Sequence, residues 1–155
     1  MIDVAPGAES LPLAASLAEL VRRNIGRDAS KRAEFDRLRG AVAVVADDQR
    51  TSLTLRFDFG HLVVHTGVVG VPDITLLGPI AVLEGLGALK ARGLLGVAWE
   101  KLREGGATRG TDAGTGARSK NHRAKDAARW GDLKIYGLWT HPVLVRRLLR
   151  VLSER

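Results

Sequence analysis

The chain contains no cysteine, few aromatic residues and no long apolar run. Without cysteine it can form no disulfide bond, no thiolate metal site and no cysteine nucleophile. No apolar stretch approaches the ~20 residues that cross a bilayer, so we expect no membrane-spanning helix. Residues 1–4 place no basic region ahead of an apolar stretch, which predicts no secretion signal. These absences favour a cytoplasmic protein.

The net charge of +7 is unevenly distributed along the 155 residues. Residues 107–130 carry 6 basic and 2 acidic groups, and residues 141–155 carry 4 and 1. Localised positive charge favours an anionic partner, such as a phosphate headgroup, a membrane surface, a CoA-type ligand or a nucleic acid. A solvated surface that only keeps the protein soluble is the alternative interpretation.

The strand pattern predicts a sheet with one wet face. Residues 41–46 are apolar on both faces, which is typical of a central strand. Residues 53–59 alternate between apolar and polar side chains, and Phe59-Gly60 suits a two-residue turn. That turn pairs Asp58 with His61 and directs both apolar faces of the hairpin to one side. Helices must then gather on that side, which is an α+β arrangement.

Several segments have helical periodicity. Gly85 and Gly87 interrupt one of them, where they either allow close packing or leave space opposite Leu55 and Leu76. The last segment is amphipathic, with an arc of arginines opposite its apolar face. The predicted helices cover residues 10–25 (capped by Ser10), 31–39 (capped by Ser30), 79–90, 94–104 and the stretch that begins at Pro142.

Residues 105–129 form a basic, glycine-rich insert. The segment holds five of the 18 glycines and almost no apolar side chain beyond alanine. It lacks the apolar area to offset an ordering cost of ~1–2 kcal/mol per residue. The sequence therefore predicts a mobile loop whose removal leaves the melting temperature nearly unchanged.

No catalytic constellation is present. The chain has no Gly-x-Ser-x-Gly motif, and residues 114–120 lack the Gly-Lys-Ser/Thr ending of a phosphate-binding loop. His61 and His65 would lie ~13 Å apart on a strand, too far to share a metal ion. Arg56, Asp58 and His61 are expected to form a surface charge cluster across the hairpin. We therefore expect no enzymatic activity, no metal and no cofactor.

The order of these segments resembles the type 2 sterol-carrier-protein lipid-binding family over residues 41–152. The resemblance rests on the Phe59-Gly60 hairpin, on Pro72-Asp73-Ile74-Thr75-Leu76, and on Gly131-Asp132-Leu133-Lys134-Ile135-Tyr136-Gly137 with the leucines that follow. It implies a five-stranded, mostly antiparallel sheet with helices on one face that enclose an apolar tunnel. The insert departs from the family pattern, in which a short turn leads to the last strand.

The resemblance also implies a function and a set of site residues. Residues 1–40 would be an N-terminal helical segment and residues 41–155 the lipid-binding domain. The implied function is binding of a sterol, fatty acid or fatty-acyl-CoA, extended to intracellular transfer and to contact with an anionic membrane. The alternatives are a polyanion- or nucleic-acid-binding module, which the lack of aromatics in the insert disfavours, and a scaffold without a ligand. The implied tunnel lining is Leu55, Phe57, Leu76, Leu83, Leu86, Leu133, Leu144 and Leu148. The positive charge of the insert and of the last helix, rather than the resemblance, predicts the contacts to an anionic headgroup: Arg118, Lys120, Arg123, Arg146, Arg147 and Arg150.

Overall fold

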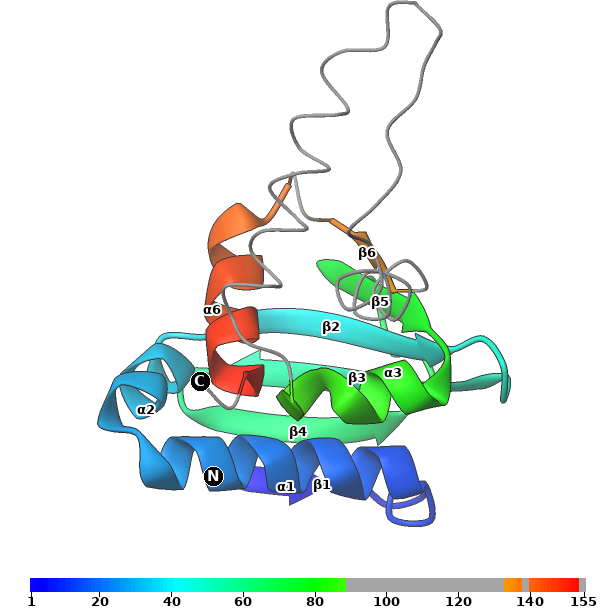
Figure 1. Ribbon diagram of the computed structural model, residues 1–155, viewed down its shortest axis with the longest axis horizontal. Coiled ribbons are helices and arrows are strands. Elements are labelled where there is room, and N and C mark those ends of the chain that lie inside the picture. Colours follow the sequence, from blue (N-terminus) through cyan, green and yellow to red (C-terminus); the bar gives the residue numbers. More distant parts are fainter. Residues whose placement is uncertain (89–132, 138–139, 154–155) are drawn as a thin grey trace, which may run out of the picture.

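The computed structural model describes residues 1–88, 133–137 and 140–153. The predicted helix over 94–104 and the basic insert at 105–129 lie outside these residues. The described chain contains one six-stranded sheet in the order β1-β4-β3-β2-β5-β6, with the helices gathered on one face (Figure 1). Its strands are β1 (Ile2–Val4), β2 (Arg39–Ala46), β3 (Thr51–Asp58), β4 (His61–Thr66), β5 (Ile74–Gly78) and β6 (Lys134–Tyr136).

The sheet is mixed, so the prediction of five mostly antiparallel strands was wrong in count and partly wrong in direction. Strands β2, β3 and β4 form the predicted antiparallel meander, and β6 pairs antiparallel with β5. Strand β5 runs parallel to β2, and β1 runs parallel to β4. With three residues, β1 is too short to produce a readable alternation pattern. The fold class α+β with helices on one face is confirmed.

The β3–β4 hairpin has the predicted register. Asp58 pairs with His61, and Phe57 pairs with Leu62. Phe59 and Gly60 have φ values of 43° and 85°, so both central residues are left-handed, as a type I′ turn requires. Phe57 is buried under the helices, whereas His61 stays partly exposed on the opposite face.

The predicted helices within the described residues exist, but their caps differ from expectation. Leu11 precedes α1 without a side-chain cap, and the hydroxyl of Ser10 donates to the Gly7 carbonyl instead. Asp28 caps α2, because its carboxylate accepts from the N–H groups of Ser30 and Lys31. Ser30 therefore lies inside the first turn. The helices are α1 (Pro12–Arg27), α2 (Ala29–Asp36), α3 (Ile80–Glu84), the 3₁₀ helix η1 (Gly85–Ala88) and α6 (Pro142–Leu152).

A hydrophobic core lies between the sheet and the helices. Figure 1 shows α1, α3 and α6 on the same side of the sheet. Leu13, Leu17 and Val21 of α1 are fully buried in this core, and each such side chain contributes about 1.5–3 kcal/mol. Residues 1–40 thus supply both a strand and core helices. None of the described helices has the length and apolar character to cross a membrane.

Candidate functional site

The residues predicted to line a tunnel all lie on the helix-covered side of the sheet. Leu55 and Phe57 of β3 and Leu76 of β5 point toward the helices and are 0–2% exposed. Leu144 at the start of α6 is only partly buried. The remaining four are buried in the same core: Leu83, Leu86, Leu133 and Leu148.

The described core is closely packed around η1. A side chain on Gly87 would overlap Leu20 of α1, so this glycine allows close contact between the two helices. Gly85 has open space beside it, since nothing in the described residues lies within 4 Å of an added Cβ. The two expectations thus divide between the glycines: Gly87 allows close packing, and Gly85 leaves space. The described residues do not outline the tunnel that the resemblance implies.

Partly buried apolar side chains border the core on several elements, among them α3, β6 and α6. Val82 belongs to α3, Ile135 to β6 and Leu144 to α6, and each packs against the buried cluster while keeping some exposure. Ile135 lies opposite Leu76 in the sheet. A ligand at these three positions would contact the core without displacing fully buried side chains.

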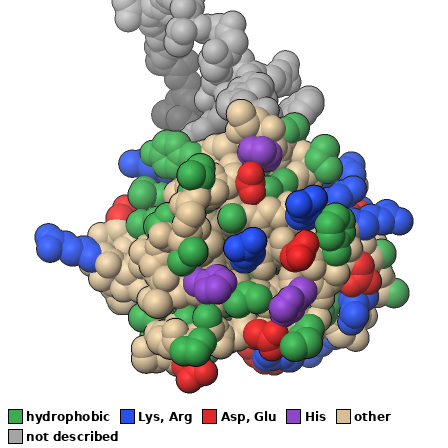
Figure 2. Space-filling view, turned by 180° about the vertical axis from the view of Figure 1, so that it is seen from behind, with side chains coloured by type: hydrophobic (Ala, Val, Ile, Leu, Met, Phe, Trp, Pro, Cys, Tyr) green, Lys and Arg blue, Asp and Glu red, His purple; other side chains and the backbone are tan. Residues whose placement is uncertain are grey.

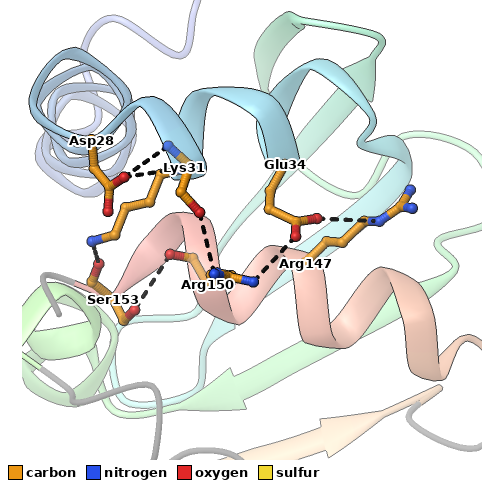
Figure 3. Close-up of polar contacts among 7 residues, drawn as sticks. Asp28, Lys31, Glu34, Arg147, Arg150 and Ser153 are labelled. Atoms are coloured by element: carbon orange, nitrogen blue, oxygen red, sulfur yellow. Dashed lines mark hydrogen bonds and ion pairs between the residues drawn. The ribbon is translucent and has the colours of Figure 1, made fainter.

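Two of the three arginines on α6 are engaged by α2 (Figure 3). The carboxylate of Glu34 lies 3.4 Å from the Arg147 Nε and 3.3 Å from an Arg150 nitrogen. Arg147 also donates to the Arg37 carbonyl, and Arg150 donates to the Ser30 hydroxyl. These contacts join α6 to α2 and already engage two arginines of the predicted cationic arc. Arg146 remains exposed, while Arg118, Lys120 and Arg123 lie outside the described residues.

A polar cluster that sequence reasoning missed closes the C-terminal end of α6. The buried amide of Asn24 donates to the carbonyls of Val151, Leu152 and Ser153, at 2.8, 3.1 and 3.3 Å. The ammonium group of Lys31 donates to the Ser153 carbonyl as well. These donors satisfy carbonyls that a helix end leaves unpaired. The sequence signal that could have revealed this cluster is Asn24, a polar residue on the apolar face of the predicted helix over 10–25.

The opposite face of the sheet carries a pocket beneath a crossover loop, here defined as residues 67–73. This loop connects β4 to β5 and lies over the outer face, where the Thr54 hydroxyl donates to the Gly67 carbonyl and accepts from the Val69 N–H. Beside it is a pocket of about 360 Å³, which we call the outer pocket. Its lining includes Arg39, Ala41, Arg56, Asp58, His65 and Val71.

The histidines do not assemble a metal or catalytic site in the described part of the chain. His61 Nε2 lies 2.7 Å from Asp3 Oδ2 on β1, so the expected cluster of Arg56, Asp58 and His61 does not form. His141 Nε2, at the start of α6, lies 3.6 Å from Asp73 Oδ1. The described residues contain no group of three or more metal-ligating side chains.

Comparisons with known proteins identify the fold. No protein-family model and no curated protein matches the chain. A solved structure described as "UbiJ-SCP2 Ubiquinone synthesis protein" has a TM-score of 0.52 and 18% identity, over 90% of this chain and 92% of that chain. A second similar structure is the solution structure of a conserved hypothetical protein from Thermus thermophilus, described as possibly a sterol carrier protein. The match covers 92% of this chain and 85% of that chain, with 13% identity and a TM-score of 0.37. The fold rests on the first similarity, which spans nearly the whole of both chains: this chain has the type 2 sterol-carrier-protein fold, as its sequence resemblance implied.

Proposed function

We propose that the protein binds a small hydrophobic ligand, such as a sterol, a fatty acid or a fatty-acyl-CoA, on the helix-covered face of its sheet. The observation that carries the proposal is the apolar face itself, which the strands and α1, α3 and α6 enclose in a sterol-carrier fold. Ligand pockets of this kind are mostly apolar, with a few polar groups at the mouth. The proposed role is binding without catalysis.

The proposed binding region is the β5–β6 side of the core. Val82 of α3, Ile135 of β6 and Leu144 of α6 are apolar residues that pack against the core and stay partly exposed. Arg146 is exposed on the outer side of α6, where a carboxylate or phosphate head that extends beyond the helix can meet it. Transfer of the ligand to a membrane or an enzyme is an extension of the same proposal.

Native mass spectrometry of the protein purified from cells tests the proposal directly. We expect a population that carries an additional mass in the range of a lipid, and that mass should disappear after organic extraction. Binding is then quantified with a fluorescent long-chain fatty acid, for which we expect micromolar affinity or better, about −8 kcal/mol. Absence of both signals would favour the scaffold alternative.

Tryptophan variants locate the ligand. Leu83 and Leu86 are fully buried, so tryptophan there would overpack the core and cost about 1–3 kcal/mol. Val82→Trp and Leu144→Trp are better probes, because both positions keep some exposure. We expect each to weaken fatty-acid binding at least tenfold. Ile25→Trp is the matched control, since Ile25 is also partly buried but lies on α1. Equal loss in all three variants would contradict the proposed location.

A further inference from the structure

The outer pocket lies on the face of the sheet that the helices leave open. Figure 2 shows this face, on which basic, acidic and histidine side chains are interspersed with apolar ones. Strands β2, β3 and β4 form the floor, and the crossover loop forms one wall through Val69, Gly70 and Val71. The two hydrogen bonds of Thr54 hold the loop in place above the sheet. The pocket is therefore formed by the sheet together with the loop that connects β4 to β5, which hydrogen bonds hold in place.

The cross-strand pairing explains why the pocket is open and why a cation faces it. Arg56 lies on β3 between Ala41 of β2 and Val63 of β4. Neither neighbour can pair with a guanidinium, and the methyl group of Ala41 leaves space above the floor. Among the described residues, no ion pair or hydrogen bond engages the Arg56 guanidinium. An arginine without a partner beside an open space can bind an added carboxylate or phosphate through two parallel hydrogen bonds.

The other charged groups of the pocket are arranged around Arg56. His65 lies on the neighbouring strand β4, diagonally across from Arg56. The Asp73 carboxylate accepts from the Ala41 N–H and lies beside His141, so it is already engaged. Asp58 lies directly opposite Arg39 in the sheet. Neither Arg39 nor Asp58 takes part in an ion pair among the described residues, and the Arg39 guanidinium lies over the Phe59 ring, 5.7 Å from its centroid. Arg56 is thus the arginine of the pocket that no described residue engages through an ion pair, a hydrogen bond or an aromatic ring.

We propose that the outer pocket binds a small anionic group, a phosphate or a carboxylate, on Arg56 with His65 beside it. The volume of about 360 Å³ is near the lower end of ligand pockets and has room for a small anion. The anionic group can belong to a free metabolite or to the headgroup of an anionic lipid. Val71, with 92% of its surface exposed at the rim, supplies an apolar contact in the second case. This site is on the opposite face from the proposed lipid site and is independent of it.

A titration of the ¹⁵N-labelled full-length chain with inorganic phosphate tests the site. We expect saturable amide shifts that are largest at Ala41, Arg56 and Val69 to Val71, with a dissociation constant in the millimolar range or tighter. Arg56→Gln should weaken binding at least tenfold, and its amide spectrum shows whether the fold is kept. Ala41→Val, which fills the floor without changing charge, should weaken binding as well. The matched control is Arg27→Gln, an exposed arginine at the end of α1, which should stay within twofold of the parent.

Vesicle binding distinguishes the two sources of the anion. Sedimentation with phosphatidylglycerol vesicles is compared with sedimentation with phosphatidylcholine vesicles, for the parent chain, Arg56→Gln and Arg27→Gln. Saturable phosphate binding supports the site with a free anion, and binding confined to phosphatidylglycerol and lost in Arg56→Gln supports it with a lipid headgroup. Two outcomes would overturn the proposal. The first is amide shifts that rise linearly without saturation, together with vesicle binding that does not depend on Arg56. The second is binding that is weakened equally in Arg56→Gln and Arg27→Gln.

Discussion

Gly137 adopts a backbone conformation that other residues avoid, at a point where two chain segments meet. Its φ is +86°, and a side chain there would overlap the backbone carbonyl of Asp73, which cannot move aside as a flexible side chain could. We expect Gly137→Ala to lower the free energy of unfolding by roughly 2–5 kcal/mol, the sum of left-handed strain and overpacking. Urea denaturation measures the change.

Gly67 provides the matched control for this variant. It is also left-handed, with φ of +72°, but nothing lies within 4 Å of an added Cβ. Gly67→Ala should therefore cost only the conformational part, roughly 1–2 kcal/mol. If the two variants were equally destabilised, close contact between Gly137 and Asp73 would not be what makes glycine necessary.

Asn24 gives a second test at the scale of single residues. Its amide is 4% exposed and donates to three carbonyls at the end of α6. Asn24→Ala removes these donors, and we expect a loss of about 1–3 kcal/mol because buried carbonyls are left without partners. Ser16→Ala, an exposed position on the same helix, should change stability by less than about 0.5 kcal/mol. If thermal and urea denaturation found Asn24→Ala as stable as the parent chain, water or Lys31 would have to replace the amide as donor.

At the scale of elements, Glu34 joins α2 to α6. Its side chain is only 14% exposed and lies within ion-pair distance of both Arg147 and Arg150. Glu34→Gln should lower stability by about 1–2 kcal/mol, because two guanidinium groups lose one partly buried carboxylate. Glu19→Gln removes the exposed pair with Arg22 on α1 and should cost less than about 0.5 kcal/mol. Denaturation of both variants in low and high salt measures the difference, and similar losses would contradict the joining role of Glu34.

The elements differ in how well their sequences specify them. The β3–β4 hairpin could be predicted with its register, because alternation and the Phe59-Gly60 turn give the same pairing. Strand β1 could not, since three residues carry no periodicity and its place beside β4 depends on tertiary contacts. The cap of α2 was assigned two positions too late because Asp28 and Ser30 are both good caps, and only the backbone geometry distinguishes them.

At the scale of the whole molecule, residues 1–40 are packed into the same core as the remainder of the described chain. Leu13, Leu17 and Val21 are buried against the sheet, so a chain that begins at residue 41 would expose a large part of the core. We expect that shortened chain to lack cooperative thermal unfolding and dispersed amide signals. A chain that begins at residue 6 loses only the edge strand β1 and should keep the fold at reduced stability. Cooperative unfolding of 41–155 would instead support the division at residue 41 that the sequence predicts.

The two candidate sites differ in how far the sequence could predict them. The burial of Leu55, Phe57 and Leu76 could be predicted, because apolar and polar side chains alternate on their strands, but whether these residues line a ligand site stays a prediction. The outer pocket could not, because it depends on where the crossover loop lies over the sheet, and the two Thr54 hydrogen bonds that fix its path leave no trace in the sequence pattern. Arg56 was recognised as a surface charge, but its lack of a partner follows only from the strand order.

The hydrogen bonds of Asn24 also determine when the protein can finish folding during its synthesis. The last of its three carbonyl partners, Ser153, is 129 residues further along the chain. At 5–20 residues per second, a ribosome takes about 6–26 s to produce that partner after Asn24 has been made. Throughout that interval the apolar face of α1 has no α6 to cover it. A ribosome-bound chain that stops before Pro142 should therefore be cut readily by proteases and be held by chaperones, whereas the released chain should resist both.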